Sequence, residues 1–138
     1  MKAGCYMPLK GRLGTPQEWL KRAKSNLALA KQPKTEDIYW EDLCFETQQA
    51  AEKALKAVLL SKKIQFRFVH DLAELITLLE NNGVSLPEGV RTAAILTDYS
   101  VEARYPGPFE PVTKEEFKKA LRIAERVVAW AEKQIVNK

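Results

Sequence analysis

Polar side chains interrupt an otherwise apolar segment, CFETQQAAEKALKAVLL (residues 44–60). Turning each residue by about 100° around a helix axis places Gln48 inside the apolar arc, and Glu52 follows one turn later at the edge of that arc. The two form an i, i+4 pair that can stack along one side of a helix. A buried carboxylate is costly unless a donor or a cation meets it. We therefore expect Glu52 to lie beside an arginine, a lysine or the histidine, or beside a water-filled groove.

This Gln48–Glu52 pair has two interpretations that the sequence leaves open. In one, the pair is structural, and it either lies exposed at the edge of the packing face or bridges two helices or two subunits. In the other, the pair forms the polar wall of a ligand groove. The same helical projection predicts that Gln49, Lys53 and Lys56 point into solvent.

A second group of polar and aromatic residues occurs in the segment DYSVEARYP (98–106). Arg104 carries a planar guanidinium with several donors, which suits a carboxylate or a phosphate. Tyr99 and Tyr105 flank it, and a tyrosine ring can stack on a base or on the guanidinium itself. This grouping predicts a site for a phosphate and a base. The alternative is that Arg104 caps helix carbonyls and bridges to a carboxylate such as Glu52.

His70 is the only histidine, and it lies in FVHDL just before a predicted helix start. A histidine at such a place can cap or pack, or it can transfer protons. Two cysteines and one histidine are too few ligands for a zinc site, and Cys44 is expected to be a small buried side chain. No spacing supplies a catalytic dyad, and no glycine-rich phosphate loop is present. We therefore expect no metal and no cofactor.

Helix signals recur along the chain, and strand signals do not. TPQE and TKEE are capping boxes, and a D-x-x-E start lies between them. The expected elements are a helix from Thr15 to Pro33, a longer one from about Ile38 to Lys62, one from Asp71 to Gly83, a short one from Pro87 that turns Val90, Ala94 and Leu96 inward, a proline-rich loop over Tyr105 to Pro111, and a final helix from Thr113 to Ile135. We predict an all-α fold, an up-down helical bundle of four to five helices in a single domain over residues 15–138, with residues 1–14 as a tail.

Length and charge are those of a soluble single-domain protein. The 138 residues suffice for one core, and the net charge of +4 comes from lysines and arginines scattered along the chain. Such a charge favours anionic partners only mildly. No apolar stretch approaches the roughly 18 residues that span a bilayer, and the N-terminus lacks the apolar core of a secretory signal. We expect a cytoplasmic protein without membrane contact.

The segments EWLKRAKSNLALA, CFETQQAAEKALKAVL, HDLAELITLL and DYSVEARYP, followed by a closing amphipathic helix, resemble the HEPN family (higher eukaryotes and prokaryotes nucleotide-binding domain) over about residues 16–136. The resemblance implies a helical bundle that usually forms a homodimer. HEPN proteins are often encoded beside a minimal nucleotidyltransferase partner, as in toxin–antitoxin pairs. Several branches are metal-independent ribonucleases, marked by an arginine followed after four to six residues by a histidine. There the histidine would transfer protons and the arginine would hold RNA phosphate, in a cleft between two protomers.

That ribonuclease signature is absent here in its usual form. No arginine stands at residues 63–65, the positions that would pair with His70, and no histidine follows Arg104 at the required distance. Lys63 stands at the first of those positions, so Lys63 and His70 keep the gap with a different cation. One alternative function is therefore a divergent metal-independent ribonuclease toxin that uses His70 with Lys63 or Arg104.

The function that we favour is a non-catalytic, dimeric HEPN domain that binds a nucleotide or a nucleotidyltransferase partner. In this hypothesis Arg104 holds the phosphate, and Tyr99 or Tyr105 stacks on the base. Gln48 and Glu52 would line the groove or steady Arg104. A third hypothesis is a dimerisation scaffold in which each of these polar groups is structural.

Overall fold

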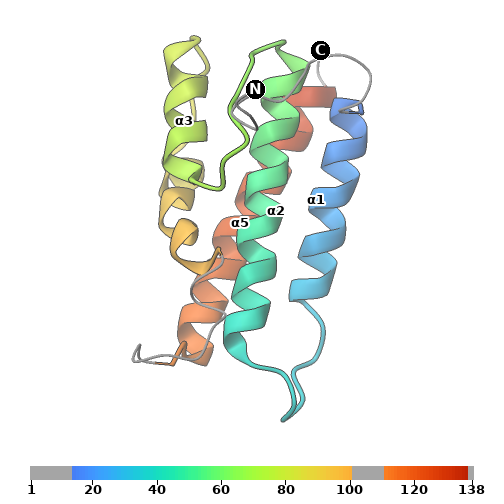
Figure 1. Ribbon diagram of the computed structural model, residues 1–138, viewed down its shortest axis with the longest axis vertical. Helices are drawn as coiled ribbons and strands as arrows, with labels where there is room; N and C mark the ends of the chain where they lie inside the picture. Colours follow the sequence, from blue (N-terminus) through green and yellow to red (C-terminus); the bar gives the residue numbers. More distant parts are fainter. Residues whose placement is uncertain (1–13, 101–110, 137–138) are drawn as a thin grey trace.

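Three long helices form the body of the protein: α1 (Pro16–Ala30), α2 (Trp40–Ser61) and α5 (Lys114–Val136). The structure is a computed structural model that describes residues 14–100 and 111–136. α2 packs against both α1 and α5 (Figure 1). On the other side of α2 stands α3 (Leu72–Asn81), which is followed by α4 (Glu88–Arg91) and a 3-10 helix, η2 (Thr92–Tyr99). The predicted all-α bundle is confirmed, because these described segments contain five α-helices and no strand.

Both predicted capping boxes form. The Thr15 hydroxyl accepts a hydrogen bond from the Glu18 amide at 3.1 Å, and the Glu18 carboxylate accepts one from the Thr15 amide at 2.9 Å. Thr113 and Glu116 make the same exchange at the start of α5, at 3.0 and 3.2 Å. Asp71 caps α3 by accepting a backbone amide two residues further on, at 3.0 Å. These contacts satisfy amide donors that have no partner inside the first turn of a helix.

The segment after α3 differs from the prediction. It begins as α4 but continues to its end as the 3-10 helix η2. Residues three apart eclipse each other in a 3-10 helix, so Ala93 and Leu96 of η2 both face the core, each at 0% exposure, and Val90 of α4 faces the core next to them at 2% exposure. Ala94, which an α-helical period would turn inward, is only half-buried. Tyr99 continues the row of three and is half-buried on the same side.

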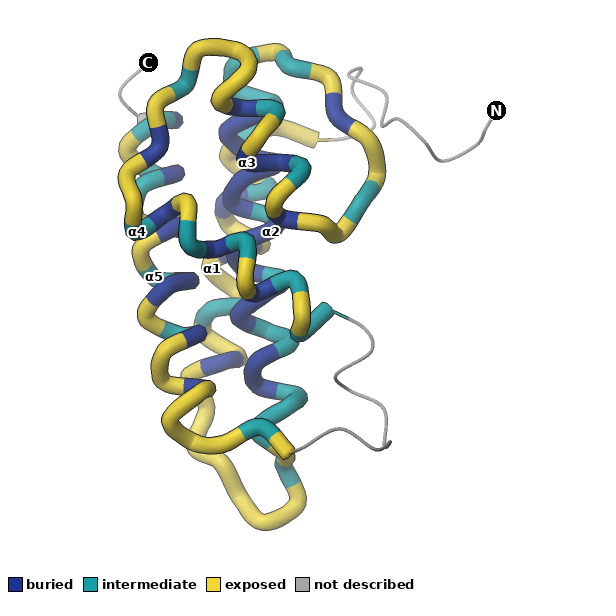
Figure 2. Tube along the Cα trace, turned by 90° about the vertical axis from the view of Figure 1, so that its left-hand side faces the viewer, coloured by how far each residue is buried: buried dark blue, intermediate teal, exposed yellow. Residues whose placement is uncertain are grey.

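The core is built around α2, whose residues Ala50, Ala51, Ala54 and Ala57 are fully buried. Their small side chains let the neighbouring helices approach closely. Figure 2 shows that buried residues line the inward sides of the helices and that exposed residues lie outside. The linker between α2 and α3, residues 62–71, runs back along α2 and covers that side of it (Figure 1). None of the described helices is long and apolar enough to cross a membrane.

Candidate functional site

One side of α2 carries four polar or ionisable residues spaced one turn apart. They are almost completely shielded from solvent, at 0% exposure for Cys44, 0% for Gln48, 4% for Glu52 and 0% for Lys56. The prediction that Lys56 points into solvent is therefore wrong. A projection of α2 alone cannot show the linker, which folds over the last three residues of this row and brings the Phe66 ring to 5.9 Å from the Lys56 ammonium. Gln49 and Lys53, which were also predicted to face solvent, are partly exposed.

The Glu52 carboxylate is the centre of this cluster. Lys56 Nζ lies 2.7 Å from Oε2, and Gln48 Nε2 donates to Oε1 at 2.9 Å. His70, which comes from the linker, places its Nδ1 2.9 Å from Oε1 and 3.2 Å from Oε2. Gln48 Nε2 also lies 3.3 Å from the His70 carbonyl oxygen, which ties the linker to α2. The prediction that Glu52 meets a cation or the histidine is confirmed, since it meets both a lysine and the histidine.

Glu52 is ionised near neutral pH. Burial alone would raise the pKa of this carboxyl. The Lys56 ammonium, with hydrogen bonds from Lys56, Gln48 and His70, outweighs burial and lowers the pKa of Glu52 below its ordinary value of 4.5. Glu52 and Lys56 therefore form a buried ion pair. The Lys56 ammonium also lies 5.2 Å from the centroid of the Phe68 ring, a distance that suits a cation over an aromatic face.

His70 is the exposed end of the cluster, with 52% of its side chain accessible. Because Nδ1 faces an ionised carboxylate, the neutral ring carries its proton on Nδ1 and keeps Nε2 as an acceptor. Among the described residues, Nε2 has no hydrogen-bond partner. Phe68 is 56% exposed, and its ring centroid lies 6.3 Å from that of His70. The surface thus presents an imidazole of fixed orientation beside an accessible aromatic ring. Nε2 can accept a proton, the protonated Nε2–H can then donate to a phosphate oxygen, and the aromatic ring can stack on a base.

Tyr99 makes its own contacts further along the molecule. Its hydroxyl donates to Glu116 Oε2 at 3.0 Å, and burial, with this hydrogen bond, raises the pKa of the phenol. Tyr99 interacts electrostatically with Cys44, so Tyr99 lies near the first residue of the α2 row. Burial raises the pKa of the Cys44 thiol to about 12. It lines a pocket of about 220 Å³ between η2 and α5, together with Ile95, Leu96, Asp98, Glu116, Lys119 and Ala120.

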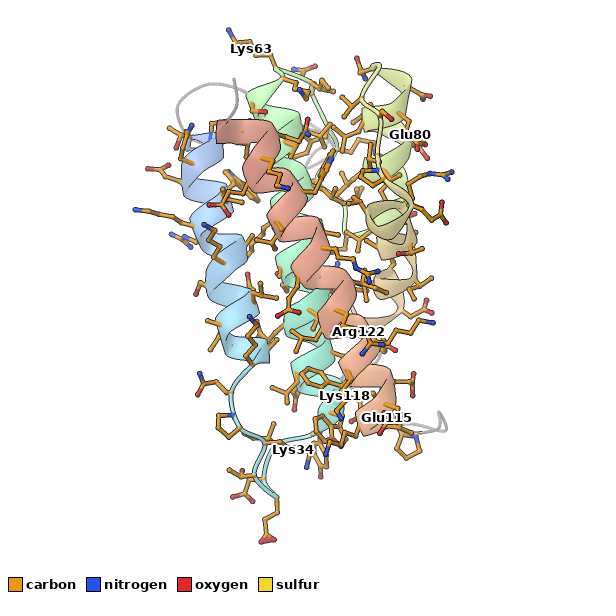
Figure 3. All side chains as sticks on the ribbon, turned by 180° about the vertical axis from the view of Figure 1, so that it is seen from behind. Lys34, Lys63, Glu80, Glu115, Lys118 and Arg122 are labelled. Carbon is orange, nitrogen blue, oxygen red and sulfur yellow. The ribbon has the colours of Figure 1, made fainter. Side chains whose placement is uncertain are left out.

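The remaining predicted site residues are not brought to His70 by the described part of the chain. Lys63 follows the end of α2 with a left-handed φ of 60°, and its side chain points away from the end of the bundle (Figure 3). It stands two positions beyond the end of α2 at Ser61, and Ser61 is nine positions after Glu52, which corresponds to about 14 Å along the helix axis. Lys63 therefore does not reach the imidazole. Arg104 and Tyr105 lie outside the described residues.

Sequence reasoning missed two members of the cluster, Lys56 and Phe68. A signal for Lys56 exists, because it stands one turn beyond Glu52 at the same spacing that links Glu52 to Gln48. Phe68 has no such signal, since QFRFVH contains two phenylalanines and only the path of the linker exposes the second one. In the described ranges, no group of three or more histidine, cysteine, aspartate or glutamate side chains could hold a metal ion.

Comparison with known proteins defines the class of this protein. The family model described as the HEPN domain matches residues 16–134, and the chain therefore belongs to the HEPN domain family. Its structure is similar to that of TT1696 from Thermus thermophilus, with a TM-score of 0.75 and 32% identity over 86% of this chain and 97% of that chain. It is also similar to ST0689, an archaeal HEPN homologue, with a TM-score of 0.70 and 27% identity over 88% of this chain and 98% of that chain. The comparison with curated proteins gives no match.

Proposed function

We propose that this HEPN protein is a nucleotide-binding module that acts as a homodimer and does not cleave its ligand. The observation that carries the proposal is the imidazole of His70, held at Nδ1 by the buried Glu52 carboxylate beside the exposed Phe68 ring. A ligand with a phosphate and a base suits this pair, because one group offers a hydrogen bond and the other offers a flat apolar face.

His70 supplies the phosphate contact in this proposal. The charge of Glu52 is balanced by Lys56 at 2.7 Å, so a protonated His70 adds a net positive charge to the cluster. Its Nε2–H would then donate a charge-assisted hydrogen bond to a phosphate oxygen. Gln48 acts indirectly, because its contact with the His70 carbonyl oxygen at 3.3 Å holds this part of the linker against α2.

Phe68 supplies the stacking surface. Stacking of a base on an aromatic side chain contributes about 1–3 kcal/mol per base. Three further residues keep the roles that the sequence suggests: Arg104 as a second phosphate contact, and Tyr105 or Tyr99 as a second ring, where Tyr99 would act from its own pocket between η2 and α5 and not beside His70. All three stay proposals, and substitution of Arg104 by alanine measures whether the guanidinium belongs to the site.

Nucleotide titrations test the proposal directly. AMP, ATP and GTP are added while intrinsic tryptophan and tyrosine fluorescence is followed in wild type, His70→Asn, Phe68→Ala and Tyr39→Ala. Tyr39 is a matched control, because it is an aromatic residue, 68% exposed, at the start of α2 far from His70. We expect saturable binding that weakens about tenfold or more in Phe68→Ala and His70→Asn and is unchanged in Tyr39→Ala. Wild-type affinity in both site variants would place the nucleotide elsewhere.

A divergent metal-independent ribonuclease, of the kind that serves as a toxin in toxin–antitoxin pairs, is the second candidate. One contact favours it: a carboxylate at 2.9 Å from Nδ1 orients an imidazole for proton transfer at Nε2. Purified protein incubated with RNA in EDTA, compared with His70→Ala, decides between the two functions. RNA that stays intact at high protein excess removes the ribonuclease; cleavage that His70→Ala abolishes removes the non-catalytic module.

The homodimer and the minimal nucleotidyltransferase partner are proposed from membership of the family. Light scattering of the purified protein tests the dimer, and co-purification with the nucleotidyltransferase of the same organism tests the partner. A dimer that binds no nucleotide and no nucleotidyltransferase would leave a structural scaffold as the function. A cytoplasmic location is part of the same proposal.

A further inference from the structure

Exposed cations form a row along the outward side of α5. Lys118, Arg122 and Arg126 stand at successive i, i+4 positions, about 6 Å apart along the axis, and all three are exposed. Lys119 is exposed next to them. Figure 3 shows Lys118 and Arg122 on the side of α5 that faces away from the rest of the bundle. We call these four residues the α5 ridge.

The α5 ridge is not neutralised within the described parts of the chain. None of its four residues forms an ion pair there. Two glutamates of α5 are instead paired with α1, Glu125 with Lys31 at 2.9 Å and Glu132 with Lys24 at 2.8 Å. These two carboxylates thus serve packing against α1, and Glu116 is bound to Tyr99 and Thr113. Glu115 is the carboxylate that lies beside the ridge, exposed one turn before Lys118 and Lys119, and the ridge keeps an excess of cations over it.

A further cation extends the α5 ridge at its lower end. The Trp40 ring packs on the ring of Phe117, with the two centroids 5.2 Å apart. Phe117 is the residue directly before Lys118 in the sequence. The ammonium of Lys34 lies 5.2 Å from the centroid of the same Trp40 ring. Lys34 is therefore fixed next to the first turn of α5, as Figure 3 also shows, and it lengthens the charged row.

The composition of the α5 ridge favours a nucleic-acid backbone over a protein surface. Protein interfaces depend on apolar and aromatic anchors at their centre. The large hydrophobic side chains that are exposed in the described ranges are Leu29, Tyr39, Phe68 and Ile95, and none of them lies on α5. A row of cations without an apolar or aromatic side chain at its centre is complementary to the evenly spaced phosphates of a nucleic-acid strand, which it can bind through charge alone.

We propose that the α5 ridge binds the phosphate backbone of single-stranded RNA without reading its sequence. The ridge lies on α5 and does not include the Glu52–His70 cluster, so the two sites can be tested separately. The preference for RNA over DNA rests on the proposed function, which takes ribonucleotides, whereas the affinity for a phosphate backbone rests on the ridge alone.

The salt dependence of binding measures the number of phosphates that are contacted. A fluorescein-labelled oligouridylate of about 12 nucleotides is titrated by anisotropy at several salt concentrations. Each neutralised phosphate of a single strand contributes about −0.7 to the slope of log K against log salt, so Lys118, Arg122 and Arg126 by themselves contribute about −2 to the slope. Affinity should then fall about 20-fold between about 50 and about 200 mM salt.

Two triple variants with the same loss of charge separate a located site from general attraction. Lys118→Gln, Arg122→Gln and Arg126→Gln together should flatten the slope by about 2. The control combines Lys21→Gln, Arg22→Gln and Lys63→Gln, three exposed cations that lie off α5, and it should keep the wild-type slope. AMP should bind the ridge variant with wild-type affinity, which distinguishes failure of the ridge from failure of the nucleotide site.

Four results would overturn the proposal. They are an unchanged slope in the ridge variant, an equal loss in the control variant, no binding even at the lowest salt, and tighter binding of a polyglutamate peptide or of oligodeoxythymidylate of the same length. Circular dichroism of each variant shows whether it is folded. The proposal that the ridge binds RNA is supported when the folded ridge variant loses binding and the folded control variant does not.

Discussion

Replacing Lys56 by methionine is expected to be strongly destabilising, because it leaves the Glu52 carboxylate buried without a cation. Lys56 is 0% exposed and Glu52 is 4% exposed, and their charged atoms lie 2.7 Å apart. Removing one partner of a buried ion pair costs about 3–5 kcal/mol. Methionine retains the length of the aliphatic stem, so little of this loss comes from packing. Gln48 and His70 still donate to Glu52, which places the expected loss near the lower limit, about 3 kcal/mol.

The double variant Glu52→Gln with Lys56→Met isolates the effect of charge. Glu52→Gln alone leaves a buried ammonium, and a loss of about 3–4 kcal/mol is expected. The double variant removes both charges and should lose only about 1–2 kcal/mol, far less than the sum of the single variants. Urea unfolding at neutral pH, followed by circular dichroism, gives the three free energies of unfolding. Losses under about 1 kcal/mol in both single variants, or additive losses in the double variant, would refute the buried ion pair.

Three further outcomes follow from the described contacts. Because the pKa of Glu52 is lowered from 4.5 in the folded state, its contribution to stability is present above pH 4.5 and is lost as the pH falls through the folded pKa. In acid unfolding, the free energy of unfolding of the double variant Glu52→Gln with Lys56→Met should therefore fall less than that of the wild type. Equal curves would argue against a carboxylate whose pKa is lowered by the fold. Thr113→Ala, which removes the cap of α5, should cost about 1 kcal/mol in urea unfolding, and no change would mean that the capping box contributes nothing. Tyr99→Phe removes the hydrogen bond to Glu116 and should cost about 0.5–1.5 kcal/mol, again by urea unfolding, whereas a gain in stability would show that the bond is not formed.

Helix starts were predictable because they depend on a few neighbouring residues. Thr15 and Thr113 each stand three residues before a glutamate, and this spacing alone defines the reciprocal hydrogen bonds of a capping box. The period of η2 was not predictable in the same way. Its sequence allows an α-helix, and only packing against its neighbours shows that Ala93 is fully buried whereas Ala94 is partly buried at the edge of the core.

The candidate site was predictable as far as a single helix determines it. The prediction that Glu52 has a polar or charged partner was correct, because burying a carboxylate is costly and any fold that buries it must supply such a partner. Desolvation did not identify Lys56 as that partner, because a projection of α2 cannot show that the linker folds back and closes the side on which Lys56 lies. For the same reason His70 could not be assigned to Glu52, eighteen residues earlier in the chain.

The single histidine permits the most direct test of whether His70 is held by Glu52 and contacts a nucleotide. In the untagged protein labelled with ¹⁵N-histidine, the two ring nitrogens of His70 are observed by nuclear magnetic resonance without overlap from any other histidine. We predict that the neutral ring carries its proton on Nδ1, that Glu52→Gln disturbs this preference, and that AMP shifts the Nε2 resonance. A neutral ring protonated on Nε2, or an Nε2 resonance that stays unchanged at saturating AMP, would contradict a phosphate contact oriented by Glu52.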